Sequence, residues 1–275
     1  MITGQTAAET TTQPLRLTLT AHEARLLFRT GQYIGYTSGF AEGYIQASLG
    51  IVPKQYALDF VTYCHRNSKA CPIIAIGNVG DPYLPMLGED LDIRTDVPRY
   101  RVFCDGEVIE EPTDIRHLWR DDLVTFVWGC SFSFEGALVK SGVSLRDVSR
   151  GDNVALYETN IDTNAVGLFS GKLIVTMRPI APSQVMRAVQ VTSRFPSVHG
   201  APIHIGTPEQ IGISDLEKPL KGKAPQVRPH EVPVFWACGV TPRQALERAR
   251  LPFCITHRPG SMVIADQLNS SLAIF

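Results

Sequence analysis

The chain has 275 residues and is long enough to bury roughly three quarters of the surface that its unfolded state exposes. Lys and Arg number 26 and Asp and Glu number 27, so there is no positive excess with which to bind a nucleic-acid backbone. No apolar run approaches bilayer-spanning length, and we therefore expect neither a nucleic-acid nor a membrane partner.

The six cysteines are spread through the predicted elements, without the dense spacing of a secreted disulfide scaffold or paired C-x2-C metal ligands. This pattern predicts a cytoplasmic protein. Residues 1–14 are polar, rich in Thr and unlike a signal peptide, so we interpret them as a flexible tail. Residues 15–275 are expected to form a single unit of two subdomains, whose boundary the sequence does not define.

Two helices are predicted near the amino terminus. Thr20 and Glu23 form a capping-box pattern, which predicts a helix near residues 20–30. Pro53 suits the first position of a second helix, and the apolar residues that follow it, such as Phe60, lie on one face at helical spacing.

Short strands follow in the next part of the chain. The apolar run at 73–76 predicts a buried strand. Asp105-Gly106 is a dipeptide that favours a two-residue turn, so we expect a β-hairpin between strands at 100–104 and 107–109. The alternating charges at 92–100 suit either an ion-pair network or recognition of a carboxylate by arginine, and we favour the network.

The second half of the chain alternates strands and helices. Residues 123–128 and 173–177 are predicted strands, and 181–195 is a predicted helix. Residues 216–230 contain three prolines and few apolar side chains, which indicates an exposed connection before a further strand at 232–236. Together the elements predict an α/β protein with a mixed sheet.

The same short sequence pattern occurs at the carboxyl ends of two of these strands. Trp128-Gly129-Cys130 and Trp236-Ala237-Cys238 both belong to the pattern W-x-C-x6-A-L, which predicts two similar strand–turn–helix units, an internal pseudo-repeat. We expect the carboxyl ends of both strands to open toward one shared cleft, where helix amino termini bind small anions. In the alternative interpretation, Trp packs the core and Cys is a small apolar residue at a tight turn.

The turn after the first of these strands carries several reactive groups. Cys130 supplies a thiol, Ser131 and Ser133 supply hydroxyls, and Glu135 supplies a carboxylate. A serine could cap the helix with Glu135 completing the cap, or the free backbone N–H groups could bind a carboxylate or an oxyanion. In the second unit Cys238 and Thr241 offer the corresponding groups, with Thr241 as the predicted N-cap.

Two further clusters contain titratable side chains. The Gly- and Pro-rich stretch 193–204 contains Arg194, His199 and His204, and the five-residue offset of the two histidines places them on opposite faces of a strand. A shared metal is therefore not expected, and either histidine could be a general base or a hydrogen-bonded structural residue. His257 lies in a predicted turn that is either a functional loop or a surface hairpin.

Several long and irregular segments run from about Gly43 to the carboxyl terminus. They are GYIQASLGIVPKQYALDF, CHRNSKACP, DIRTDVPRYRVFCDGEVIEEPTDI, LWRDDLVTFVWGCSFSFE, FSGKLIVTMRPI, VTSRFPSVHGAPIHIG, VPVFWACGVTPRQA and ITHRPGSM. On these segments the chain resembles the bacterial hydro-lyase family related to the amino-terminal region of D-glutamate cyclase. It departs from the family pattern at Ser48, where Asn is usual, and at Ser261, where His is common, and either change could alter specificity at a substrate contact.

The resemblance implies a two-part α/β fold and chemistry like the reversible hydration of 5-oxo-D-proline to D-glutamate. Opening this lactam needs an activated water, a stabilised oxyanion and a partner for the substrate carboxylate. We assign Glu135 or His199 as the base, the N–H groups after Cys130 or Cys238 as the oxyanion site, and Arg194 as the carboxylate partner. No cofactor is required by this chemistry.

Two other functions remain open from the sequence. The chain could bind a small carboxylated metabolite without transforming it, or Cys130 and Cys238 could form an acid–base pair for racemisation or dehydration. His257 is a further candidate catalytic residue, and Ser131, Ser133, His204 and Thr241 are further candidates for substrate binding. Whether the chain forms a homo-oligomer also stays open.

Overall fold

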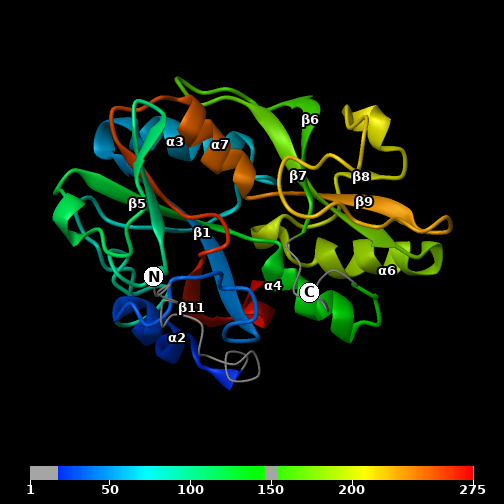
Figure 1. Cartoon of the computed structure of the whole chain (residues 1–275), viewed down its shortest axis with the longest axis horizontal. Coiled ribbons are helices and arrows are strands. Elements are labelled where there is room, and N and C mark those ends of the chain that lie inside the picture. The colour runs from blue at the N-terminus through cyan, green and yellow to red at the C-terminus, as the bar shows by residue number, and fades with distance from the viewer. Residues whose placement is uncertain (1–17, 146–153, 275) are drawn as a thin grey trace, which may run out of the picture.

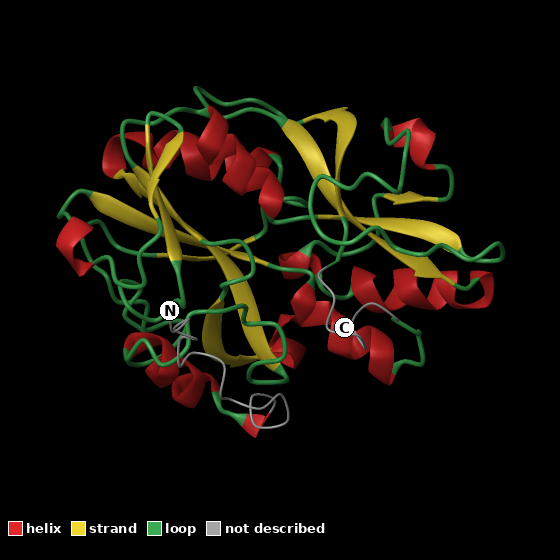
Figure 2. Cartoon of the chain, viewed as in Figure 1, coloured by secondary structure: helices red, strands yellow, loops and turns green. Residues whose placement is uncertain are grey.

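The structure, a computed structural model, describes residues 18–145 and 154–274, so the tail expected over 1–14 lies outside the described residues. Two sheets lie side by side, with helices above and below them in the view of Figures 1 and 2. The described α-helices are α2 (Ala21–Arg29), α3 (Lys54–Arg66), α4 (Phe132–Lys140), α6 (Pro182–Ser193) and α7 (Val240–Arg248). None of these helices is long and apolar enough to cross a bilayer.

The larger sheet has seven strands in the order β2-β5-β1-β10-β3-β4, with β11 also paired to β1. Its strands are β1 (Tyr44–Pro53), β2 (Ile73–Ile76), β3 (Tyr100–Cys104), β4 (Glu107–Glu110), β5 (Leu123–Gly129), β10 (Cys254–His257) and β11 (Val263–Leu268). The smaller sheet has the order β6-β7-β9-β8. Its strands are β6 (Leu156–Asp162), β7 (Lys172–Ile180), β8 (His204–Ile205) and β9 (Val232–Ala237).

The expected α/β architecture is confirmed, whereas the mixed sheet is not, because every pairing between named strands is antiparallel. The central strand β1 was not predicted at all. It pairs with β5, β10 and β11 and is buried over nearly its whole length. Conversely β2, predicted as a buried strand, is a half-exposed edge strand that pairs with β5.

The predicted helices and most strands are present. The capping box of Thr20 and Glu23 starts α2, and Pro53 is the residue before α3 rather than its first position. Asp105 and Gly106 both have positive φ, as the two-residue hairpin turn between β3 and β4 requires. The connection at 216–230 is largely exposed and forms no helix or strand.

An ion-pair network forms around the acidic residues before the hairpin, as predicted. Arg29 pairs with Asp96 at 2.6 Å and with Asp90 at 3.0 Å, and Arg94 pairs with Asp92 at 2.7 Å. Because these charges are partnered inside the protein, this segment is a structural element and not a carboxylate site.

The two tryptophans of the W-x-C pattern pack reciprocally. The Trp128 indole N–H donates to the Gly239 carbonyl at 2.9 Å, so the tryptophan before α4 contacts the start of α7. Trp236, which precedes α7, packs on Phe134 of α4 with ring centroids 6.0 Å apart. This cross-packing ties the two sheets together, although β5 and β9 have different neighbours and an internal repeat is not confirmed.

Candidate functional site

Cys130 and Cys238 follow the ends of β5 and β9, and their sulfurs accept backbone N–H groups from the first turn of each helix. The Phe132 N–H bonds the Cys130 sulfur, and the Val240 N–H lies 3.5 Å from the Cys238 sulfur. Burial raises the pKa of Cys130 to about 12 and raises that of Cys238, and each thiol lies close enough to Arg178 for that cation to lower its pKa. Cys238 also raises the pKa of Cys130, so the two thiols lie near each other, while the shared cleft expected between the two units stays a prediction.

Gly129 explains why the first unit has glycine between Trp and Cys. A Cβ on Gly129 would lie 2.1 Å from the Ser197 carbonyl oxygen and 2.9 Å from the Val198 Cα. The Gly129 N–H donates to the Pro72 carbonyl at 2.9 Å. The end of β5 is therefore clamped between the loop before β2 and the turn that carries His199.

Arg178 is the residue around which the site is organised, and sequence reasoning missed it. The guanidinium is almost fully buried, and its Nε and Nη2 both donate to Oε1 of Glu135, the Nε at 3.2 Å. Nη2 also donates to the Ser131 hydroxyl at 3.2 Å, and Nη1 donates to the Thr176 hydroxyl at 3.0 Å. The only signal in the sequence was a single charge, Arg178, within the otherwise uncharged run LIVTMRPI.

This arrangement corrects the expected helix caps. Ser131 is the N-cap residue of α4, but its hydroxyl and Glu135 turn toward Arg178 and make no cap hydrogen bond. Ser133 lies inside the first turn with its hydroxyl 3.5 Å from the Gln46 carbonyl. In the second unit Gly239 is the N-cap of α7, and the buried Thr241 hydroxyl accepts the Ile174 N–H at 3.0 Å. Each helix begins two residues after a cysteine, and the cysteine sulfur accepts the N–H of the first helical residue, Phe132 or Val240.

His199 is buried and uncharged at neutral pH. Its Nδ1 donates to the Lys69 carbonyl at 3.0 Å, so the neutral ring carries its proton there. Nε2 makes no hydrogen bond of ordinary geometry within the described residues, although the Gly129 backbone lies close to the ring. Burial and the positive field of Arg178 lower the pKa of His199 to about 4. Its φ of 84° is a left-handed conformation that non-glycine residues rarely adopt.

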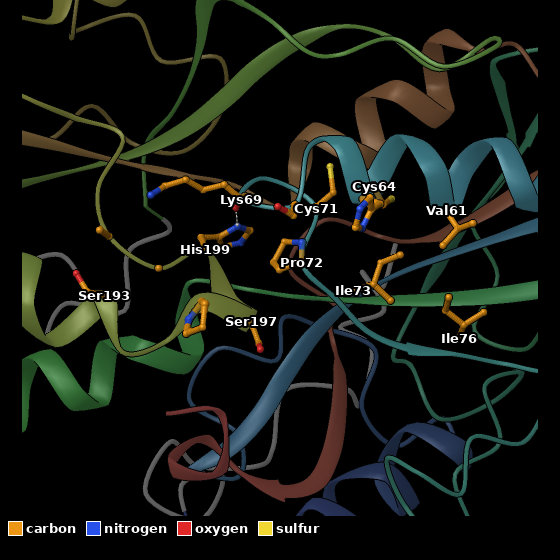
Figure 3. A pocket seen from close by; sticks show the side chains of 15 residues that line it. Val61, Cys64, Lys69, Cys71, Pro72, Ile73, Ile76, Ser193, Ser197 and His199 are labelled. Atoms are coloured by element: carbon orange, nitrogen blue, oxygen red, sulfur yellow. Dashed lines mark hydrogen bonds between the residues drawn. The ribbon is translucent and has the colours of Figure 1, made fainter. Parts of the chain in front are cut away.

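A pocket of about 720 Å³ lies on the outer side of His199. As Figure 3 shows, it is bounded by the end of α3, the loop before β2 and the segment from Ser193 to Ala201, with His199 beside the Lys69 backbone. Neither Cys130 nor Cys238 lines this pocket. His199 is therefore the one side chain of the predicted site that borders both the pocket and the surroundings of Arg178.

His257 lies at the buried end of β10, so the predicted surface turn begins only after it. Its Nδ1 lies 3.1 Å from the Leu49 backbone nitrogen and 3.3 Å from the Leu49 carbonyl oxygen, so it can accept from the first or donate to the second, depending on the tautomer. Burial and the positive fields of Arg243, Lys221 and Arg101 lower the pKa of His257 to about 3. The imidazole is thus neutral at neutral pH and lies within a group of cations.

The other predicted residues have varied positions. Arg194 is exposed at the C-cap of α6, and His204 lies on the edge strand β8 with Nε2 2.7 Å from the Thr207 carbonyl. Ser48 is buried on β1, opposite Trp128, and lies 3.1 Å from where a Cβ on Gly239 would be. Ser261 is buried and donates to the Gly35 carbonyl at 3.0 Å, which is a structural contact.

Comparison with known proteins identifies a family. The D-glutamate cyclase family matches residues 124–266, which include Cys130, Glu135, Arg178, Cys238 and His257. A protein of Bordetella petrii named "putative hydro-lyase" is 53% identical over 255 residues, covering 93% of this chain and 97% of that protein. A protein of Bordetella pertussis with the same description is 54% identical over 261 residues, covering 95% and 94%.

Among solved structures, a nitrogen repressor-like protein of Methanococcus jannaschii aligns over 90% of this chain and 99% of its own. The sequence identity is 12% and the TM-score is 0.38, a likeness too weak to support any argument about this fold.

Proposed function

Because the chain belongs to the D-glutamate cyclase family of bacterial hydro-lyases, we propose that it catalyses the reversible addition of water to a small carboxylated metabolite. The reaction we favour is the opening of 5-oxo-D-proline to D-glutamate. In this reaction water attacks the lactam carbonyl, an oxyanion forms, and the ring nitrogen leaves as the amine.

The observation that carries the proposal is the placement of Glu135. Arg178 holds one carboxylate oxygen, Oε1, and fixes the side chain. Within the described residues Oε2 makes no hydrogen bond or ion pair, although the side chain is nearly buried. A carboxylate with one oxygen held and one oxygen free is suited to take a proton from water. We propose that Glu135 is the base and Arg178 its positioning residue.

His257 and Arg243 supply the remaining two requirements. In the tautomer whose Nδ1 accepts the Leu49 N–H, the neutral His257 presents Nε2–H, a donor that can stabilise an oxyanion without losing a proton. Arg243 is a buried cation close to both Cys238 and His257, and it replaces the exposed Arg194 as the proposed partner of the substrate carboxylate. Both groups are held on rigid elements, β10 and α7.

The two-cysteine mechanism receives less support. It needs one thiol to act as a thiolate base, but burial raises the pKa of both Cys130 and Cys238, so both are protonated at neutral pH. Their sulfurs also accept helix N–H groups. We propose that the thiols form part of the wall around the reacting centre.

Turnover of 5-oxo-D-proline, D-glutamate and related hydroxy acids should be measured with the wild type, Glu135→Gln and His199→Asn. Loss of a general base is expected to lower kcat by about a hundredfold to ten-thousandfold. Glu158→Gln, which changes a carboxylate of similar size on the surface of β6, is the matched control and should leave kcat unchanged.

Normal turnover by Glu135→Gln with a loss in His199→Asn would move the role of base to His199. Normal turnover by both variants would contradict the proposed roles of these residues. If carboxylates bind to the wild type but none is transformed, a non-catalytic binding protein becomes the better description.

A further inference from the structure

Arg243 is a buried cation whose guanidinium makes only one long ion pair within the described residues. Its side chain is 10% exposed, and its one ion pair, to Glu247 on the next turn of α7, spans 3.5 Å between Nη1 and Oε1. Among the described residues it makes no hydrogen bond, although a guanidinium has five N–H donors. A buried cation in this state is stabilised by an anionic ligand that completes its hydrogen bonds.

Three more cations lie near Arg243 and come from different elements. Lys221 belongs to the connection before β9, Arg101 to β3 and Arg258 to the turn after β10, and all three lower the pKa of Lys221 or His257 through their positive fields. Lys221 is exposed, so it lies at the rim, and it has no ion pair within the described residues. We call Arg101, Lys221, Arg243 and Arg258 the cationic cluster.

The carboxylates that face the cationic cluster carry too little negative charge to neutralise it. Glu111 pairs with Arg101 at 2.6 Å and lies 3.6 Å from Arg258, and Glu247 is the partner of Arg243. His257 is uncharged at neutral pH. Four cations and two carboxylates leave an excess of two positive charges, so one substrate carboxylate would neutralise only half of it.

We propose that the cationic cluster binds two carboxylate groups of one ligand, so that the protein is selective for short dicarboxylates. This inference rests on the proposed function, in which Arg243 holds the first carboxylate. Lys221 and Arg101, which lie near His257, then hold the second. Opening a lactam converts its carbonyl into a second carboxylate, so the cluster favours the ring-opened dicarboxylate over the monoanionic lactam.

Calorimetric titration with glutarate and with butyrate, which lacks the second carboxylate, tests the proposal. Glutarate should bind the wild type about five- to tenfold more tightly than butyrate at low salt. Lys221→Gln should remove most of this preference and leave butyrate affinity unchanged. Lys218→Gln is the matched control, since this exposed lysine on the same connection pairs with Asp215, and it should keep the preference.

Arg243→Gln should weaken both ligands, and Arg243→Lys, which keeps the charge, should retain part of the binding if the buried glutamine variant folds poorly. Arg248→Gln changes an exposed arginine of the same helix and should alter neither affinity. The preference for glutarate should also decline above pH 8, because partial burial and the fields of Arg243 and Arg101 lower the pKa of Lys221 to about 8.

Equal affinities for glutarate and butyrate, or a preference that Lys221→Gln leaves intact, would overturn the second carboxylate site while the proposed hydration reaction could still hold. Tighter binding of inorganic phosphate than of glutarate would overturn it in favour of a phosphate ligand. Failure of the wild type to bind or transform any carboxylate would overturn both this inference and the proposed function.

Discussion

Arg178 and Glu135 form a buried ion pair with further polar support from Ser131 and Thr176. The guanidinium also lies 5.5 Å and 5.4 Å from the ring centroids of Phe134 and Trp236. Such a pair contributes little net stability compared with apolar residues, because both charges lose water, but breaking it leaves one charge uncompensated. The pair is therefore better explained by the orientation it gives to the Glu135 carboxylate than by the stability it adds.

Replacing Arg178 with Met should lower the free energy of unfolding by about 3–5 kcal/mol, since Glu135 then stays buried without a partner. Urea denaturation at neutral pH measures the change. Arg248→Met is the control, because it breaks an exposed pair with Glu158 at 2.9 Å and should cost under about 1 kcal/mol. Similar losses in the two variants would contradict this account of the buried pair.

Replacing Glu135 and Arg178 together tests whether their energies are coupled. Arg178→Met combined with Glu135→Leu removes both charges, so the double variant should be more stable than Arg178→Met alone. Equal stability of these two proteins would indicate that Arg178 is needed for packing against the two aromatic rings, and not for its charge.

At the scale of elements, the sequence predicted what local patterns determine. The capping box of α2, the Asp105-Gly106 turn and the apolar run of β5 each depend on neighbouring residues, and each is present. The strand β1 was missed because its run YIQASLGIVP contains Gly, Ser and Gln and lacks a clear period of two. Its three neighbouring strands, distant in sequence, bury it.

The candidate site was predicted only where it depends on local sequence patterns. The W-x-C pattern located the ends of β5 and β9. The predicted cap hydrogen bonds of α4 and the predicted cap residue of α7 were wrong, because serine and threonine patterns give no information on a distant partner. Ser131 accepts a hydrogen bond from Arg178, and Thr241 accepts one from Ile174. Both of these partners lie on another strand, β7. Arg243 was likewise missed, since its role depends on Lys221 and Arg101, which approach from other elements.

Gly129 should be intolerant of any side chain, because a Cβ would approach the Ser197 carbonyl oxygen to 2.1 Å. We expect Gly129→Ala to destabilise the protein by about 1–3 kcal/mol through overpacking and to displace the turn of His199. Gly136→Ala is the matched control, since Gly136 lies within α4 with open space around its Cα and the change should stabilise the helix by about 0.5–1 kcal/mol.

Thermal and urea unfolding of both glycine variants measure these changes. A Gly129→Ala protein as stable as the wild type would contradict the clamp at the end of β5. A lower kcat in a correctly folded Gly129→Ala protein would instead indicate that the position of the turn of His199 matters for catalysis.

On the scale of the whole molecule, the candidate site draws on both sheets. Ser48 and His257 come from the larger sheet, while Arg178 and the approach to Cys238 come from the smaller one. The reciprocal packing of Trp128 and Trp236 holds the sheets in this relation. Any condition that separates the sheets should therefore remove the site before it disrupts either sheet.

Acid is such a condition, because His199 and His257 are buried on the two sides of the site and are uncharged in the folded protein. Their pKa values are lowered to about 4 and about 3, against 6.5 in the unfolded chain, so unfolding binds protons below pH 6.5. The contribution of the neutral histidines is full above pH 6.5 and is lost progressively as the pH falls toward 4 for His199 and toward 3 for His257. Each histidine should lower the free energy of unfolding by about 1.4 kcal/mol per pH unit in this window.

Urea unfolding of the wild type, His199→Asn and His257→Asn at pH 7, 6 and 5 should show a shallower pH dependence in each variant than in the wild type. His230→Asn is the control, since His230 is exposed on the connection before β9 and its removal should leave the slope between pH 6 and 5 unchanged. Identical slopes in the wild type and both buried-histidine variants would mean that the two imidazoles are accessible to protons in the folded state. The neutral donor role proposed for His257 would then fail as well, because an accessible imidazole would be charged at the lower pH values.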